Sequence, residues 1–449
     1  MAKTDSTPLD SILHALDRES VEEIREQLLE LHPAEIANVI EALPHDDRDV
    51  IWALIDEEII NDVLTDVEDE IRAARLLQMQ PEALAQAAQD LDIDDAVDIL
   101  QDLPEDVIDV VLRQMDEQNR QLLESAMAYP EDTAGGLMMV EDFITVRADV
   151  SLEVVLRYLR AKGEIPEKTD RLLVVDRDNR YEGRLRLAGL LINSPEAMVA
   201  DVMETDVPGI PVMTPSHDVA TLFEQRDLIS AGVVDDAGVL LGRITVDDVV
   251  DVIRGEGEHD LMSMAGMDEH YDMFAPVLVT SRRRALWLGV NLATALLASW
   301  VIGLFEASIE AVVALAVLMP VVASMGGIAG SQVLTVVIRG MALGQVERRN
   351  ALDLLSHELR VGVINSVGWA LVIGLVAYVW FDSPGLAVIV GVALVVNVIV
   401  AAIFGALIPM ALKRMSIDPA LAGGVVLTTV TDVVGFVAFL GLGTLFLLP

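Results

Sequence analysis

The stretch Leu427-Thr-Thr-Val-Thr-Asp-Val-Val-Gly435 decides how the rest of the chain is interpreted. It lies within an apolar segment, residues 421–448, that exceeds the roughly 20 residues a helix needs to cross a bilayer. An ionised carboxylate in the middle of such a span costs roughly 2.5–3.5 kcal/mol or more. Asp432 therefore predicts a span that faces water or a cation. A protonated Asp432 bonded to a neighbouring helix is the structural alternative.

Four more apolar segments precede this one, near residues 285–305, 311–338, 361–381 and 386–412. Every Lys and Arg from residue 282 onward falls before the first span or in the loops on that same side: Arg282, Arg283, Arg284, Arg339, Arg348, Arg349, Arg360, Lys413 and Arg414. Because basic loops stay in the cytoplasm, this pattern predicts a multi-pass protein of the cell (inner) membrane. Its N-terminal half is expected to be cytoplasmic and its C-terminus external.

Charge is distributed very unevenly along the 449 residues, which carry 30 Lys and Arg against 72 Asp and Glu. From residue 282 onward there are nine basic and eight acidic residues, so 21 basic and 64 acidic residues lie before it. This acidic first half excludes nucleic acid as a partner, since such binding needs a basic face. The absence of cysteine excludes disulfide and thiolate chemistry. With only four Lys, the bulk charge also fits adaptation to a salt-rich medium.

The spans are too polar for simple lipid anchors. No basic residue lies within a span to pair with the carboxylate. The amides, hydroxyls and glycines that accompany it are Asn291, Asn365, Asn397, Ser324, Gln332, Thr335, Thr428, Thr429, Thr431, Gly326, Gly327 and Gly330. Hard oxygen ligands suit Mg²⁺, which keeps much of its water and is held by one or two carboxylates. Soft metals prefer Cys, Met or His. We therefore predict a magnesium path.

The acidic half contains two internal repeats. Residues 10–125 have helical periodicity, and 36–44 resembles 96–104 with the Leu-Pro pairs 60 residues apart, which predicts stacked helical hairpins in a small superhelix. From about residue 137, strands alternate with helices, and 174–184 matches 233–243 at an offset of 59. This pair resembles tandem CBS domains. Asp247, Asp248 and Asp251 open the last helix of the second copy, where capping explains one or two acids but not all three.

Over essentially its whole length the chain resembles the MgtE family of magnesium channels and transporters. The motifs that carry the resemblance are Tyr129-Pro-Glu-Asp-Thr-Ala-Gly135, Gly242-Arg-Ile-Thr-Val-Asp-Asp248, Pro320 to Gly330 with Gln332, Arg339-Gly-Met-Ala-Leu-Gly344, and Asp418-Pro-Ala-Leu421 followed by Thr428 to Asp432. The resemblance implies a multidomain membrane protein that forms a homodimer with its pore between protomers. It divides the chain into an acidic helical domain (1–130), two CBS domains (137–199 and 200–253), a connecting plug helix (254–281) and a five-helix transmembrane domain (282–449).

The resemblance also implies roles for individual residues. Asp432 matches the pore carboxylate, Gly327, Ile328, Gln332, Thr428 and Thr431 are expected to line the pore, and Asp418 is expected at its cytosolic mouth. Cytosolic Mg²⁺ is expected to close the pore by bridging acids of facing domains: Asp92, Asp94 and Asp95 with Asp247, Asp248 and Asp251, and a second cluster of Glu258 and Asp260.

Two departures from the family pattern bear on these roles. Ile328 stands where the family usually has Asn, which removes a polar group from the pore side and affects ion selectivity or flux. Arg254 and His259 stand where the family often has acids, and His259 is expected to be a solvated helix residue. Adenine nucleotide is a further expected ligand of the CBS pair, although the sequence shows no decisive signature for it.

Other classes of function remain as alternatives. The chain would otherwise be a membrane-anchored CBS sensor of nucleotides or ions that conducts nothing, or a related transporter of Mn or Co. Asp432 argues against the sensor, because an anchor needs no buried acid. An enzyme is not expected, since the sequence has no phosphate-binding glycine loop, nucleophile triad or metal-binding His cluster.

Overall fold

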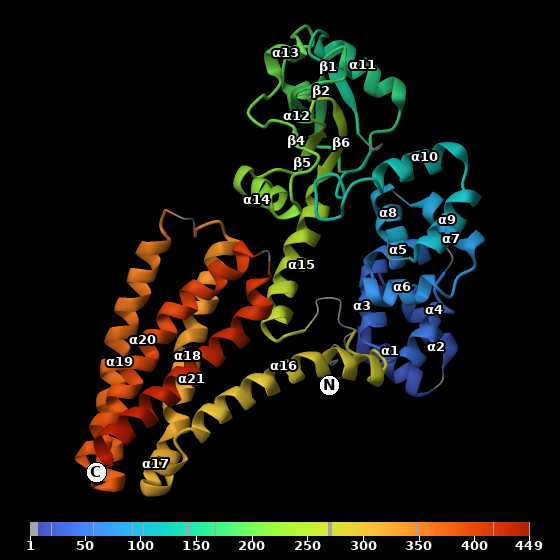
Figure 1. The fold of residues 1–449 in the computed structure, drawn as a ribbon. Helices are drawn as coiled ribbons and strands as arrows, with labels where there is room; N and C mark the ends of the chain where they lie inside the picture. Colours follow the sequence, from blue (N-terminus) through green and yellow to red (C-terminus); the bar gives the residue numbers. More distant parts are fainter. Residues whose placement is uncertain are drawn as a thin grey trace, which may run out of the picture. The chain divides into compact units, whose positions relative to one another are not determined.

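The computed structural model describes residues 8–448 except 19, 57, 92, 102, 141–142, 167, 268–271, 347–348 and 416, together with the backbone but not the side chains of 90 and 94. The chain divides into two compact units (Figure 1). One comprises Met1–Gly257 and His270–Ala275, and the other comprises Glu258–Glu269 and Pro276–Pro449.

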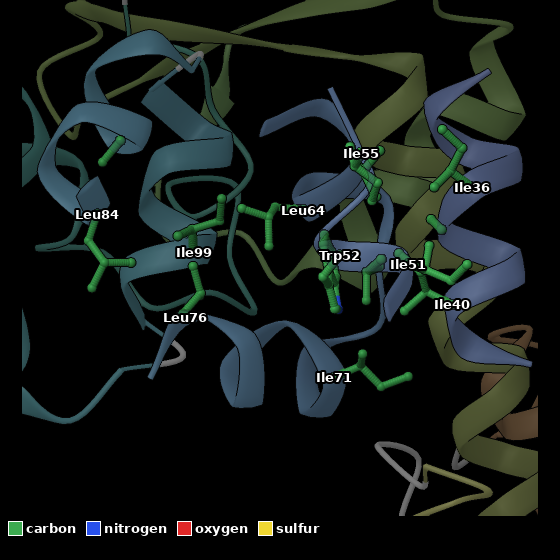
Figure 2. Packing of buried hydrophobic residues seen from close by; sticks show 14 of the residues in the cluster. Ile36, Ile40, Ile51, Trp52, Ile55, Leu64, Ile71, Leu76, Leu84 and Ile99 are labelled. Atoms are coloured by element: carbon green, nitrogen blue, oxygen red, sulfur yellow. The ribbon is translucent and has the colours of Figure 1, made fainter. Parts of the chain in front are cut away.

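Short helices of seven to ten residues build the first part of the chain. They are α1 (Pro8–Asp17), α2 (Val21–Leu28), α3 (Pro33–Glu41), α4 (His45–Trp52), α5 (Ile60–Asp66), α6 (Asp69–Leu76), α7 (Pro81–Asp90), α8 (Ile93–Gln101), α9 (Glu105–Gln114) and α10 (Glu117–Ala126). Their apolar faces meet in one core that includes Ile36, Ile40, Trp52 and Ile99 (Figure 2). The predicted helical array is confirmed.

The predicted 60-residue repeat places equivalent residues in equivalent positions. Pro44 and Pro104 are the N-caps of α4 and α9. Because the residue before a proline is pushed out of the helical region, each preceding helix ends just upstream of its Leu-Pro pair. Ile40 in the first copy and Leu100 in the second are both fully buried. The repeat therefore reflects two helical hairpins that bury the same positions.

Two small three-stranded sheets follow, and in each the strands lie side by side in the same order as in the sequence. The first contains β1 (Thr145–Arg147), β2 (Arg171–Val175) and β3 (Tyr181–Arg186), and the second contains β4 (Ile210–Pro211), β5 (Ser230–Val234) and β6 (Leu240–Thr245). In each sheet the first pair is parallel and the second antiparallel. The helices α11 (Leu152–Lys162), α12 (Leu187–Ile192), α13 (Val199–Val202) and α14 (Ser216–Arg226) accompany them.

The hairpin turns of the two sheets obey the predicted offset of 59. Asn179 (φ 59°) and Gly238 (φ 79°) occupy equivalent left-handed positions, which only Gly, Asn and Asp adopt readily. The turns also bond to each other, since the Tyr181 N–H donates to the Gly238 carbonyl at 3.0 Å and the Leu240 N–H to the Asn179 carbonyl at 2.9 Å. The two copies thus form one paired module.

The connecting helix differs from the prediction of residues 254–281. Helix α15 (Val246–Met264) begins at the end of β6 and is continuous with the second CBS copy. It ends where Gly266 takes a left-handed conformation (φ 70°), and Pro276 is the N-cap of the next helix. The sequence pattern of residues 254–281 did not predict this break, because Gly266 and Pro276, ten residues apart, fit either one kinked helix or two separate helices.

A buried ion pair ties α4 to the segment that precedes the first span. The Arg48 guanidinium donates to both carboxylate oxygens of Asp272 at 2.7 Å, and its Nε donates to the Ile40 carbonyl at 2.9 Å. The side chains are only 5% and 9% exposed. Burial alone would raise the pKa of Asp272, but its bonds to Arg48 and to the Phe274 N–H outweigh that effect and lower it.

Among the described residues, five helices are long and apolar enough to cross a membrane. They are α16 (Val277–Gly303), α18 (Ala314–Ala342), α19 (Ala351–Phe381), α20 (Pro384–Arg414) and α21 (Pro419–Leu447), and the short α17 (Glu306–Ala311) follows α16. The five-span prediction is confirmed, although α16 starts at Val277 and α19 at Ala351, which are eight and ten residues before the predicted apolar segments. Apolar length sets how much of a helix fits in hydrocarbon, whereas the helix itself continues into polar sequence.

Candidate functional site

One face of α18 carries the predicted polar residues. Ser324, Ile328, Gln332 and Thr335 are exposed in the single chain, spaced by three or four residues, while Gly326 on the opposite side is buried. Side chains at this spacing share one side of a helix. Ile328, 56% exposed, is therefore an apolar residue in an otherwise polar stripe.

Helix α21 presents Asp432 and Thr428 on one face, one helical turn apart. Asp432 is half-buried and Thr428 exposed. Within the part of the chain that the structure describes, no charged group or hydrogen-bond donor acts on the Asp432 carboxylate. Thr428 donates its hydroxyl to the Gly424 carbonyl of its own helix at 3.0 Å, which leaves its oxygen lone pairs open. The carboxylate and hydroxyl together offer the hard oxygen atoms that a hydrated Mg²⁺ prefers.

The structure places Thr431 differently from its predicted pore-lining position. Its side chain is fully buried, on the same face of α21 as Leu427 and Gly435. Its hydroxyl donates to the Thr428 carbonyl at 3.1 Å. Within the single chain Thr431 packs between helices, since it is one residue, or about 100°, away from Asp432 around the helix.

Asp418 lies at the N-terminus of α21 and caps it. Its carboxylate accepts the N–H groups of Ala420 at 2.9 Å and Leu421 at 3.0 Å. The imidazole Nε2 of His259, on α15, lies 3.6 Å from Oδ2 of the same carboxylate. His259, expected to be a solvated helix residue, is 42% exposed and also faces the acid that was predicted at the cytosolic mouth. The two residues are an ion pair when the imidazole is protonated.

The start of α15 holds the predicted regulatory acids, and two of them have local partners. Thr245 donates its backbone N–H to Asp248 Oδ2 at 3.2 Å, as in a helix cap. Asp247 pairs with Lys168 and accepts the Thr245 hydroxyl. Burial would raise the pKa of Asp247, but the bonds from Lys168 and Thr245 outweigh it and lower that pKa. Capping therefore explains Asp248, as expected, but not Asp251.

Electrostatic effects connect these acids with the helical array. Hydrogen bonding to Asp247 raises the pKa of Lys168, against partial loss of solvation, and Asp248 and Asp95 add to the increase. Loss of solvation raises the pKa of Asp251; Arg254 opposes this, while Asp247 and Asp66 reinforce it. Asp95 of α8 is thus near enough to act on Lys168, and Asp66 of α5 is near enough to act on Asp251. Asp66 and Lys168 were not among the predicted site residues, although Lys168 is one of only four lysines in the chain.

The predicted magnesium clusters are only partly visible. Asp92 and the side chain of Asp94 lie outside the described residues, and Glu258 and Asp260 belong to the unit that does not contain Asp247. Among the described side chains, no three Asp, Glu or His residues are grouped so as to hold a metal ion. The carboxylates around Asp247 have the right chemistry for Mg²⁺. Their role as a metal site stays a prediction.

Comparison with known proteins identifies the family. A curated protein of Thermus thermophilus, "Magnesium transporter MgtE", is 33% identical over 444 residues, covering 97% of this chain and 98% of the relative. The chain belongs to the MgtE family. Its profiles match as the MgtE intracellular N domain at residues 31–132, the CBS domain at 134–193 and 199–255, and the MgtE "divalent cation transporter" domain at 319–442.

Other MgtE proteins give similar matches. "Magnesium transporter MgtE" of Bacillus subtilis is 28% identical over 427 residues, covering 95% of this chain and 94% of the relative. A crystal structure described as the cytosolic domain of the Mg²⁺ channel MgtE in complex with ATP is 32% identical, with a TM-score of 0.49. It covers 54% of this chain and 99% of that one. The MgtE transporter profile spans both α18, with Ile328, and α21, with Asp432.

Proposed function

We propose that this MgtE-family chain is a magnesium-selective channel or transporter of the cell membrane. The observation that carries the proposal is Asp432, a half-buried carboxylate within a membrane-spanning helix on which no cationic or donor group of the described residues acts. A solvated divalent ion offsets the cost of such a charge, whereas lipid does not. The curated magnesium transporters that match nearly the whole chain support magnesium as the transported ion.

A homodimer completes the pore in this proposal. The polar stripe of α18 is exposed in the single chain, and α16 buries only Ala298 and Val301 among its residues. A second copy would cover the polar stripe of α18, since polar groups exposed to lipid are costly. The acidic half is cytoplasmic and the C-terminus external, supported by Arg282–Arg284 and the other basic residues on one side of the spans.

Cytosolic magnesium closes the pore in this proposal, by bridging acids of the helical array and the second CBS copy. Support comes from the like charges of Asp247 and Asp66, which act on Asp251, and from Asp95 of the helical array, which acts with Asp247 on Lys168. Divalent ions that bind only the closed arrangement shift the equilibrium toward it by their differential affinity. Magnesium is therefore both cargo and regulator, and not an enzyme cofactor. Adenine nucleotide at the CBS pair stays a prediction.

The test is ion uptake by proteoliposomes that contain the purified full-length chain. Magnesium uptake is expected in wild type and is expected to be lost in Asp432→Asn. Asp382→Asn is the matched control, since Asp382 is an exposed acid at the end of α19 in a left-handed conformation that Asn tolerates.

Other outcomes lead to the alternatives. Uptake of Mn²⁺ or Co²⁺ in preference to Mg²⁺ would make the chain a transporter of those ions. No uptake of any divalent ion by folded wild-type protein would favour the membrane-anchored sensor.

A further inference from the structure

Asn397 is a fully buried amide in α20, the span that packs against both α18 and α21. Its Nδ2 donates to the backbone carbonyl of Val322 in α18 at 2.9 Å. Buried side-chain bonds between helices fix their distance and rotation more narrowly than apolar packing does, since the geometry of the bond is directional. Asn397 therefore joins α20 to one of the two helices that carry the proposed ion path.

Two glycines make room for this amide, one on each neighbouring helix. A Cβ at Gly326 of α18 would lie 2.1 Å from Asn397 Nδ2, and a Cβ at Gly435 of α21 would lie 2.7 Å from the same atom. Both distances are far below van der Waals contact, so neither position accepts a side chain while Asn397 is present. The amide thus occupies the space between α18 and α21.

Contacts farther along α18 and α21 show that the amide lies at the depth of Asp432. Gly330 of α18 packs against Leu427 of α21, and Leu334 of α18 packs against Gly423 of α21. Residue numbers rise on one helix as they fall on the other, so the pair is antiparallel. By this register, Thr431 lies opposite Gly326, the residue that Asn397 contacts, and Asp432 is the next residue along α21.

The second polar atom of the amide has no partner. Asn397 Oδ1 is buried without any hydrogen bond in the described part of the protein. An unpaired buried acceptor costs free energy that a leucine of similar size would not incur, so packing alone does not account for an amide here. A residue that is unfavourable for stability and lies beside a functional group is best explained by function.

We propose that Asn397 is a positioning residue for magnesium passage: its amide, held by Val322 and seated between Gly326 and Gly435, sets the separation of α18 and α21 beside Asp432. This rests on the proposed function. An apolar side chain in its place fills the space but lets α18 rotate and slide, which changes the width of the path at the carboxylate.

The experiment compares Asn397→Leu and Asn397→Ala with Leu394→Ala in the full-length protein. Leu394 is 1% exposed and lies one turn earlier in α20, so its truncation reports a buried cavity without loss of a polar contact. For each variant we would measure folded yield, thermal unfolding, and Mg²⁺ and Co²⁺ uptake per folded protein. Asn397→Leu should unfold at or above the wild-type temperature. Its Mg²⁺ uptake should fall by about tenfold, the scale of one lost buried hydrogen bond, and the Mg²⁺ to Co²⁺ ratio should change.

Leu394→Ala should unfold at lower temperature while uptake per folded protein and ion ratio stay at wild-type values. Asn397→Leu with wild-type uptake and ion ratio would overturn the proposal. Equal losses per folded protein in Asn397→Ala and Leu394→Ala would also overturn it, because they would show a role in packing alone.

A stability cycle tests the geometry independently of transport. Gly326→Ala alone should lower the unfolding temperature, because the new Cβ meets the amide, and adding Asn397→Ala should restore part of the loss. Additive losses would refute the contact between the two residues. If wild-type protein takes up no magnesium, the proposed function fails. If wild-type protein is active and Asn397→Leu has the same uptake and ion ratio, only the positioning role is refuted.

Discussion

Replacing Arg48 by Met should release the segment before the first span from the helical array. The substitution removes two 2.7 Å bonds to Asp272 and leaves that carboxylate in a place where only 9% of it is exposed. Breaking one side of a buried ion pair costs roughly 3–5 kcal/mol. Asp272 keeps the Phe274 N–H, 2.8 Å away, so we expect the lower end of that range.

Hydrogen–deuterium exchange of the full-length chain, read by mass spectrometry, is the appropriate assay. Exchange reports local opening of one segment, which an unfolding temperature of the two-unit chain does not resolve. A loss of about 3 kcal/mol corresponds to roughly hundredfold faster exchange of the Phe274 amide and its neighbours, if opening of the pair controls their exchange. Arg113→Met is the matched control, because Arg113 pairs with Asp109 at 3.6 Å with both side chains more than 70% exposed.

Arg113→Met should leave the exchange rates near residues 272–275 unchanged, since exposed ion pairs contribute only about 0–1 kcal/mol to stability. Unchanged exchange in Arg48→Met would refute the reasoning that this pair holds the segment.

The pH dependence of this segment is also defined. Because the folded pKa of Asp272 is lowered, its contribution is present above the unfolded pKa of about 3.9 and is lost as pH falls through the folded value. Acidification from pH 7 to 5 should therefore leave the wild-type segment protected.

Three further predictions concern magnesium. Lys168→Met should lower the magnesium concentration needed for half-maximal protease protection of the cytosolic half, because the ammonium group that competes for Asp247 is gone; an unchanged or higher midpoint would contradict this competition. Replacing Asp247, Asp248 and Asp251 together by Asn should remove most of that protection and leave uptake active at high magnesium, with sodium at matched ionic strength giving no protection in wild type. Equal protection by sodium would mean that the acids serve only solubility. Ile328→Asn should raise magnesium uptake or sharpen the preference for Mg²⁺ over Ca²⁺, since it restores an amide to the exposed face of α18; identical uptake and selectivity would show that the apolar residue is neutral.

Much of the architecture was predictable because its signals are local or periodic. Five apolar segments and the one-sided basic residues such as Arg339 and Arg360 indicated the spans, since hydrocarbon thickness and charge placement act on each segment alone. The offsets of 60 and 59 indicated two repeats, and the structure buries Ile40 and Leu100 alike. Asp432 stood out because a carboxylate in a span is costly wherever the other helices lie.

The candidate site was predictable in part only. Residue type and membrane depth selected Asp432, Thr428 and Gln332, but the burial of Thr431 depends on how α21 is rotated against α18. Lys168 could not be assigned to Asp247, because the two are 79 positions apart and nothing in the intervening sequence encodes their meeting. The family motif that ends at Gly135 gave no reason for its glycine; in the structure its Cβ would lie 2.6 Å from Tyr129.

The sequence by itself determined the helices, the strands, the two repeats and the chemical nature of the proposed ion path. These depend on periodicity, turn residues and hydrophobic length, which act over one or two dozen neighbouring residues. Only the tertiary structure decided which polar groups meet: Arg48 with Asp272, His259 with Asp418, and Asn397 with Val322. Each pair joins segments distant in sequence, so its existence depends on the packing of whole helices and leaves no local pattern to read.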